Sequence, residues 1–276
     1  MTWRVIVTLA GHELRASLRN RWFMLYATAF AVLAAALSAF SLSGAGMFGF
    51  AGFGRTAASL INLTLLIVPL MGVTVGAAGL AGERERGTLA YLLAQPVGRL
   101  EVLLGKFVGL AAALLAALLL GFGLSALLIA RQGGGVDASR YLALVGFALL
   151  LALVSLSLGL LISAWSRTAP LATGVSLFVW LALVFFGDLG LMGGAIAMKL
   201  DIGVLFGLAL ANPLQVFKIA TVYALQASLE VLGPAGLFAI RTYGAGLMTL
   251  LVSVLAAWML VPLAGAYWGL RRVGDV

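Results

Sequence analysis

The chain has 276 residues, of which 63% are hydrophobic and only 9% are charged, with no cysteine and a net charge of +8. Because soluble domains carry about a quarter charged residues, this composition excludes a soluble globular fold. The lack of cysteine excludes a disulfide framework. The arginines stand in short clusters between apolar runs, which is typical of membrane topology signals rather than of a nucleic-acid partner. We therefore expect an all-α, polytopic membrane helix bundle, formed as a single transmembrane domain by residues 1–276.

Residues 1–21 are predicted to form an interfacial helix along the bilayer surface. Polar and basic side chains recur at helical spacing on one stripe, namely Arg4, Thr8, His12, Arg15 and Arg19. The opposite face is apolar and consists of Trp3, Ile6, Val7, Ala10, Leu14 and Leu18. Such a helix places its cations near anionic lipid headgroups. The alternative is a plain basic flank before the first membrane span.

Six transmembrane helices are predicted from the intervals without charged residues. Each interval holds the roughly 20 apolar residues that a spanning helix needs. The predicted spans are 23–43, 58–82, 107–130, 141–165, 169–187 and 244–268. Close helix contacts are expected at glycine pairs with four-residue spacing. These pairs are Gly72/Gly76, Gly105/Gly109, Gly203/Gly207 and Gly265/Gly269.

The distribution of positive charge predicts the orientation of the bundle. Six spans place both termini on the same side of the membrane. With the N-terminus inside, the inner segments hold 11 Lys and Arg residues and the outer segments hold 6. This asymmetry follows the positive-inside rule, so both termini are predicted to be cytoplasmic, in a bacterial inner membrane. A seventh span at 202–217 is disfavoured, because it would place Arg271 and Arg272 outside.

The inner segment 83–100 contains a short predicted helix. Alternating charges from Glu83 to Arg86 end the second span, and Gly87 permits a turn. Thr88 is expected to cap the helix by accepting a backbone N–H, and Pro96 to stop it. The helix would carry an apolar face of Leu89, Leu92 and Leu93. That face could dock into the groove of a partner or pack on its own bundle, and the spacing does not decide between the two.

The stretch 188–241 is predicted to form outer, re-entrant helices before the last span. Its apolar pieces are interrupted by charges and by Gly-Gly, Asn-Pro and Gly-Pro pairs. The piece from Ile202 to Phe217 is short for a membrane span. We therefore expect helices that dip into the membrane or lie on its surface.

The residues needed for catalysis in the membrane are missing from the predicted spans. No predicted span has an ionisable side chain well inside it, which argues against proton pumps, ion-coupled transporters and intramembrane metalloproteases. His12 is the only histidine, so Ser-His chemistry has no base near the serines of the spans. No P-loop motif is present. We expect a non-enzymatic subunit with no catalytic, cofactor or metal site, and any ATP that drives it must bind to another chain.

The chain resembles the membrane subunits of type-2 ABC exporters. The most specific part of the resemblance is Glu83-Arg84-Glu85-Arg86-Gly87-Thr88-Leu89, followed by Leu92-Leu93 and Pro96. Within that class it is most similar to the Nos-type permeases, whose transporter serves copper maturation of nitrous oxide reductase. The matching pieces are Arg19-Asn20-Arg21-Trp22, Phe30-Ala31-Val32-Leu33-Ala34, Gly87-Thr88-Leu89, Pro96-Val97-Gly98-Arg99, Leu104-Gly105-Lys106-Phe107-Val108-Gly109 and Asn212-Pro213 with Phe217-Lys218.

The resemblance implies partners and a coupling interface. It implies a cytoplasmic ABC ATPase that binds ATP and Mg, a second permease copy, and a periplasmic copper-handling protein. The implied ATPase-coupling interface is Glu83, Glu85, Arg86, Gly87, Thr88, Leu89, Leu92, Leu93 and Pro96. The matching outer region is Asn212, Pro213, Phe217 and Lys218.

The sequence does not identify the substrate of such a permease. Copper pathways favour sulfur and imidazole ligands, and this chain has no cysteine and one histidine, so we expect copper not to cross it. One alternative is export of a lipid, drug or other small molecule. Another is mechanical transmission to a periplasmic partner. An enzyme acting on lipid or peptide within the membrane is a third.

Overall fold

The computed structural model describes residues 3–43, 51–131, 138–196, 201–225 and 233–272, and every element in these ranges is helical. The long helices are α2 (Arg21–Ser43), α3 (Ala51–Glu85), α5 (Arg99–Arg131), α6 (Ala138–Trp165), α7 (Ala169–Ile196) and α11 (Leu247–Arg272). The short ones are α1 (Trp3–Arg19), α4 (Thr88–Leu93), α8 (Ile202–Leu210), α9 (Pro213–Ala224), α10 (Gly233–Tyr243) and the 3-10 turn η2 (Gly244–Gly246). The predicted all-α class is confirmed.

Six helices in these ranges are long and apolar enough to cross a membrane, and they are the six long helices. Their order agrees with the predicted spans, although the helices run past the predicted apolar limits. The largest extensions are in α7, which ends at Ile196 and not at residue 187, and in α5, which begins at Arg99 and not at residue 107. Helices α3 and α4 end shortly before the turn residues Gly87 and Pro96. A change from apolar to charged sequence is therefore not what ends a helix here.

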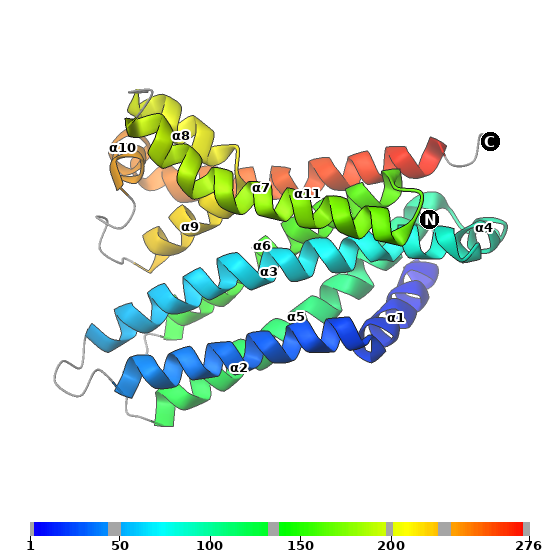
Figure 1. Cartoon of the computed structure of the whole chain (residues 1–276), viewed down its shortest axis with the longest axis horizontal. Helices are drawn as coiled ribbons and strands as arrows, with labels where there is room; N and C mark the ends of the chain where they lie inside the picture. The colour runs from blue at the N-terminus through cyan, green and yellow to red at the C-terminus, as the bar shows by residue number, and fades with distance from the viewer. Residues whose placement is uncertain (1–2, 44–50, 132–137, 197–200, 226–232, 273–276) are drawn as a thin grey trace.

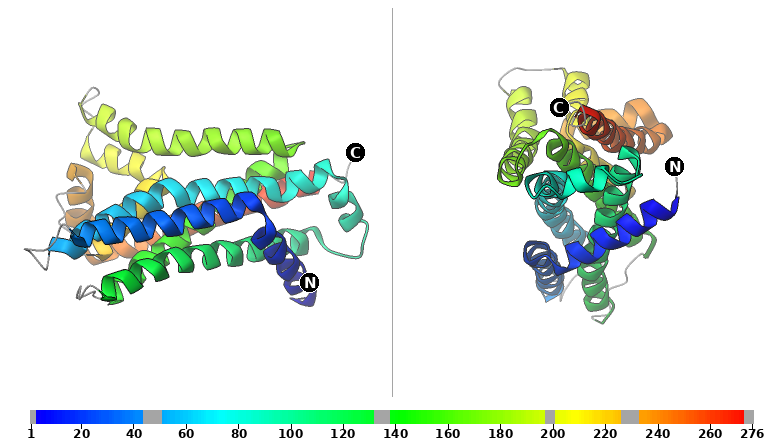
Figure 2. Two further views of the ribbon diagram at one scale, coloured as in Figure 1. Left: turned by 60° about the horizontal axis from the view of Figure 1, so that its bottom comes forward. Right: turned by 90° about the vertical axis from the view of Figure 1, so that its right-hand side faces the viewer.

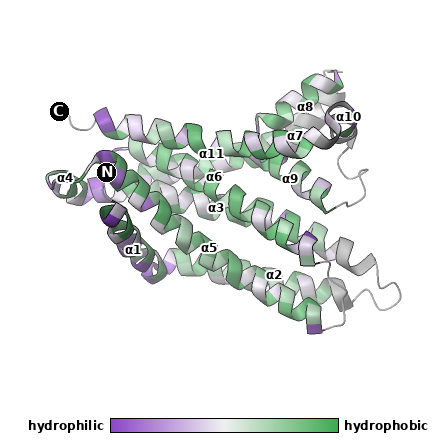
Figure 3. Ribbon diagram, turned by 180° about the vertical axis from the view of Figure 1, so that it is seen from behind, coloured by the Kyte–Doolittle hydropathy of each residue, from purple (hydrophilic) through white to green (hydrophobic). Residues whose placement is uncertain are grey.

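The two ends of the bundle differ in composition. Figure 1 shows α1, α4 and the C-terminus at one end, which we call the α4 end, and α8 and α10 at the other, the α8 end. The hydrophilic segments gather mainly around α1, α4 and the last turn of α11, whereas the middle of the bundle is hydrophobic (Figure 3). Helix α1 and the last turn of α11 thus lie at the same end of the bundle, as six crossings require (Figure 1).

The α3–α6 pair is the most extensive helix contact in the bundle. Its closeness depends on three glycines, Gly72 and Gly76 on α3 and Gly159 on α6. A Cβ at Gly76 would lie 2.6 Å from the carbonyl oxygen of Leu156, a distance that real Cβ atoms do not adopt. The predicted role of the Gly72/Gly76 pair is confirmed. The prediction for Gly203/Gly207 is wrong at Gly207, because a Cβ there would meet no atom within 4 Å.

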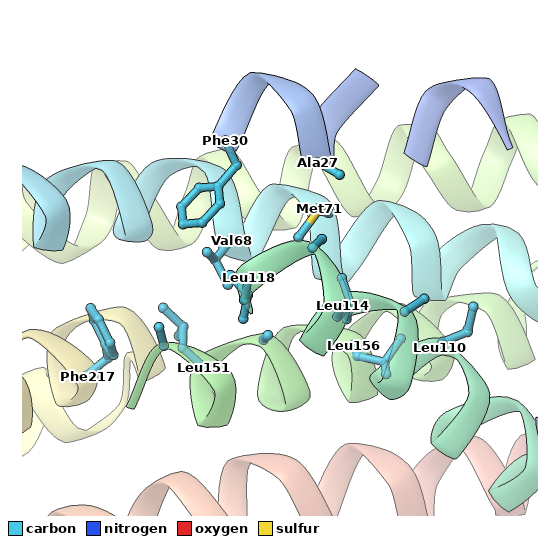
Figure 4. Packing of buried hydrophobic residues seen from close by; sticks show 14 of the residues in the cluster. Ala27, Phe30, Val68, Met71, Leu110, Leu114, Leu118, Leu151, Leu156 and Phe217 are labelled. Carbon is cyan, nitrogen blue, oxygen red and sulfur yellow. The ribbon is translucent and has the colours of Figure 1, made fainter. Parts of the chain in front are cut away.

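The main hydrophobic core fills the space between these helices. Figure 4 shows its centre, where side chains from α2, α3, α5, α6 and α9 converge. The labelled residues are Ala27, Phe30, Val68, Met71, Leu110, Leu114, Leu118, Leu151, Leu156 and Phe217. Phe217 is fully buried, so α9 reaches the interior even though it belongs to the outer region.

Helices α8 and α9 form one bent unit at the α8 end. Their axes differ by 106° across a break at Ala211 and Asn212. Asp201 caps α8 by accepting the N–H of Gly203, and Asn212 caps α9 by accepting the N–H of Leu214. Because α10 again lies at the α8 end, the chain enters and returns on the same side (Figures 1 and 2). The predicted interruption of this stretch into short helices is confirmed, and their re-entry into the membrane stays a prediction.

Candidate functional site

The short helix α4 stands between the ends of α3 and α5, where the sequence predicted it. Gly87 precedes it with a φ of 73°, a left-handed conformation that glycine adopts without steric cost. The predicted capping role of Thr88 is wrong. Its Oγ1 donates to the carbonyl oxygen of Glu83 at 3.1 Å, so the hydroxyl closes the turn from α3 and caps no N–H of α4.

The apolar face of α4 packs against the protein itself. Leu89 is only 2% exposed, and Leu92 and Leu93 are half-buried against the main core. The sequence left this face open between docking and internal packing, and the fold has it packed internally. Tyr91 points the other way and is 74% exposed. A helical projection of residues 88–93 places Tyr91 opposite the leucines, which is the one signal in the sequence that separates it from them.

A buried ion network joins α1, α3 and α5 next to α4. The Lys106 ammonium lies 2.7 Å from Glu83 Oε1 and 3.1 Å from Glu13 Oε2. Lys106 is only 3% exposed. Its partners come from the end of α3 and from α1, so one lysine of α5 joins three helices. The sequence placed Lys106 at the edge of a span, and the only available signal was that Glu13 is the single acidic residue before the first span.

Helix α1 approaches α5 closely enough for this network because of Gly105 and Gly109. A Cβ at Gly105 would lie 2.6 Å from Leu9 Cβ, and one at Gly109 would lie 2.5 Å from the carbonyl oxygen of Ala10. These glycines bracket the position of Lys106 along the helix. The α1–α5 contact therefore has both a close backbone approach and an ion pair.

The predicted face pattern of α1 needs one correction. The stripe of Arg4, His12, Arg15 and Arg19 is exposed as expected. The apolar face, however, divides into two parts, because Ile6 and Ala10 are buried while Trp3, Val7 and Leu18 remain exposed. The buried part packs on α5, and only the exposed part is free to enter the lipid interface.

The last turn of α3 also holds the α6–α7 turn. Arg84 donates to the carbonyl oxygen of Ala164 at 3.1 Å and to that of Ser166, at the C-terminal end of α6. Glu85 Oε2 accepts the N–H of Ala169, the first residue of α7, at 2.9 Å. A cation at a helix C-terminus and a carboxylate at an N-terminus both match the helix dipoles. The charge run from Glu83 to Glu85 therefore holds three other helices, α5, α6 and α7, in place.

The predicted outer residues lie around the start of α9. Asn212 Nδ2 donates to the carbonyl oxygen of Leu183 on α7 at 2.6 Å, and Pro213 occupies the first turn of α9. Phe217 is buried in the main core and Lys218 is half-buried. These residues attach the bent α8–α9 unit to α7 and to the bundle interior, away from α4.

The described ranges contain no group of three or more His, Cys, Asp or Glu placed to hold a metal ion. The features at the α4 end are thus a short helix with one exposed aromatic side chain, an ion network and two helix caps.

Known proteins are similar to this chain over most of its length. The family model for "ABC-2 family transporter protein" matches residues 7–274. The curated "Probable ABC transporter permease protein NosY" of Stutzerimonas stutzeri is 33% identical over 270 residues, which cover 96% of this chain and 97% of that protein. The protein of the same name from Pseudomonas aeruginosa is 34% identical over 230 residues, covering 81% and 84%. With its six spans, the chain is a multi-pass membrane protein that belongs to the ABC-2 transporter family, as the permease subunit of an ABC transporter.

Proposed function

We propose that this permease is driven by a separate cytoplasmic ABC ATPase that docks on α4, and that the α4 end faces the cytoplasm across a bacterial inner membrane. The observation that carries the proposal is the attachment of α4. One side is fixed to the bundle through Leu89 and the nearby Glu83–Lys106 pair, while the other presents Tyr91 outward. A helix attached in this way can be displaced by a partner protein without detaching from the spans.

The coupling residues divide by role in this proposal. Arg86, Gly87, Thr88 and Pro96 are exposed with Tyr91 and would contact the ATPase. Glu83, Leu89, Leu92 and Leu93 face the bundle and would pass the movement on. Glu85 would do the same through its bond to the start of α7.

The proposed mechanism is a two-state movement of rigid elements. ATP binding and hydrolysis take place in the partner, and closure of the ATPase pair would displace α4. Lys106 would carry that displacement to α1 and α5, and Arg84 with Glu85 would carry it to α6 and α7. The tight α3–α6 contact would make these helices tilt together.

The movement would arrive at the α8 end through α7, because Asn212 of α9 is bonded to Leu183 of α7. Helix α8 exposes Ile202, Val204 and Leu208, an apolar face suited to an outer partner protein. We therefore favour mechanical transmission to a periplasmic partner, in the maturation of a copper enzyme as the Nos-type resemblance implies. Transport of a lipid, drug or other small molecule is the second candidate, and substrate-dependent transport in liposomes holding only the permease and its ATPase would favour it.

A second copy of the permease completes the proposed transporter. Helix α7 is the least buried of the six spans, and it exposes Phe178, Phe185 and Phe186. Rigid aromatic side chains on an exposed helix face are favourable anchors for a helix–helix interface. We propose that α7 packs against the second copy, giving a homodimer.

Orientation can be tested directly because the chain has no cysteine. Gln95→Cys places a single thiol beside α4, and Arg241→Cys places one at the exposed end of α10. A membrane-impermeant maleimide is expected to label Arg241→Cys in intact spheroplasts, and Gln95→Cys only after permeabilisation. Labelling of Gln95→Cys in intact spheroplasts would end the proposal that α4 meets a cytoplasmic ATPase.

Tyr91→Ala should weaken ATPase binding by roughly 10- to 100-fold, because an exposed aromatic residue at an interface centre is a common anchor. The measurement is the dissociation constant between the purified permease in nanodiscs and its ATPase. Tyr243→Ala is the matched control, since Tyr243 is 42% exposed but lies at the α8 end. Equal affinities for wild type and Tyr91→Ala would rule out docking on this face of α4.

Lys106→Met should lower the stability of the permease by roughly 3 kcal/mol, because it leaves two largely buried carboxylates without their cation. Thermal unfolding in detergent, followed by size-exclusion chromatography, reports the change. Arg131→Met, an exposed position on the same helix, is the control. Adding Glu83→Gln to Lys106→Met should recover part of the loss. If the Lys106→Met variant unfolds at the wild-type temperature, the ion network does not contribute to the stability of the permease.

Phe178→Ala should weaken the proposed homodimer, because Phe178 is 72% exposed on α7. Single-molecule subunit counting in lipid bilayers gives the dimer fraction at a set density. Val261→Ala, at a 70% exposed position on α11, is expected to leave the dimer unchanged. A monomeric wild type, or equal dimer fractions in both variants, would contradict pairing through α7.

A further inference from the structure

A cavity of about 650 Å³ lies between α1, α2, α3 and α7 near the α4 end. Its volume falls within the usual range of small-molecule sites, about 300–1,000 Å³. One part of the wall is polar and consists of His12, Glu13, Asn20, Glu83 and Arg86. The other part is apolar and aromatic and includes Trp22, Phe23, Tyr26, Val75 and Leu177. The cavity is therefore amphipathic. Its polar wall shares Glu83 and Arg86 with the proposed coupling segment, whereas its apolar part has no role in the proposed ATPase contact or output.

The residues around the cavity place it at the junction of α1 and α2, beside the charged residues Glu83 and Arg86. Figure 2 shows this junction, where α1 turns away from the first span α2. In the proposed orientation, this is the level at which lipid headgroups meet acyl chains. Trp22 is 70% exposed and Leu177 is 38% exposed, so the apolar part reaches the outer surface of the bundle. A bound molecule could thus keep its polar end inside and let an apolar tail continue into the bilayer.

The polar wall carries both signs of charge. Glu13 and Glu83 share one cation, Lys106, which leaves one carboxylate charge in excess. Arg86 supplies a positive charge on the same wall. A purely anionic ligand would face two carboxylates, and a purely cationic one would face Arg86 with Lys106 behind. A ligand with one phosphate and one ammonium group can satisfy both signs at once.

We propose that this cavity binds one zwitterionic phospholipid of the α4-end leaflet, with a headgroup that carries both a phosphate and a primary ammonium. The phosphate lies toward Arg86, His12 and Asn20, and the ammonium lies toward Glu13 and Glu83. An acyl chain follows Phe23, Tyr26 and Leu177. Such a lipid fills the space between α2 and α7, so it supports the packing of α1 and α2 against the rest of the bundle.

Native mass spectrometry of the purified chain, supplied in turn with phosphatidylethanolamine and phosphatidylglycerol, tests the proposal. We expect one phosphatidylethanolamine to be retained per chain at collision energies that strip phosphatidylglycerol. Ala78→Trp fills the cavity from α3 and should lower this retention by roughly tenfold, the equivalent of about 1.4 kcal/mol. Ala257→Trp, at an exposed position on α11, is the matched control.

A second cavity-filling variant and a soluble competitor complete the test. Thr173→Trp fills the same cavity from α7, so it replaces Ala78→Trp if that variant does not fold. Soluble O-phosphoethanolamine should not displace the lipid, because it lacks the acyl chains that the apolar wall holds. Equal retention of both lipids, retention unchanged in the filled variants, or displacement by O-phosphoethanolamine would each overturn the proposal.

Discussion

Lys106 places a full positive charge inside α5, and the arrangement of the α4 end follows from how that charge is neutralised. An unpaired ammonium in a nearly water-free position costs several kcal/mol, so the fold must bring carboxylates to it. Glu83 comes from the last turns of α3 and Glu13 from α1. Because the two acids belong to different helices, one lysine fixes where α1 lies and where α3 ends. The position of α4, which follows α3 directly, is set by the same contact.

Close backbone approach and charge pairing reinforce each other at this end. Without Gly105 and Gly109, α1 would stand farther from α5 and Glu13 would be out of reach of Lys106. Without the ion pair, the apolar contact of α1 with α5 would do little to hold α1 there, since apolar side chains gain nothing by leaving lipid for protein. The glycines therefore let α1 come close to α5, and the ion pair makes this position more favourable for α1 than contact with lipid.

The middle of the bundle is held by different means, and this suits a protein that must move as connected parts. The α3–α6 contact has glycines on both helices and hydroxyl bonds such as the one from Ser163 Oγ to the carbonyl oxygen of Ala77, at 2.6 Å. Such a contact resists separation. Helix α7 is mostly exposed. Glu85 ties its first residue to α3, and in its middle Trp180 bonds to Leu66 of α3 and Leu183 to Asn212 of α9. A helix attached at these few points can carry movement from α3 to α9.

The sequence by itself determined the fold class, the six spans, the interruption of the stretch before the last span and the place of α4, because apolar length and turn residues are local properties of the chain. It did not determine which face of α4 is outward, since Leu89 and Tyr91 both suit an interface until the neighbouring helices are in place. Nor did it reveal the partners of Lys106, the division of the apolar face of α1 or the amphipathic cavity. Each of these depends on contacts between residues far apart in the chain. Only the tertiary structure decides which helices come close enough to share a charge or enclose a space.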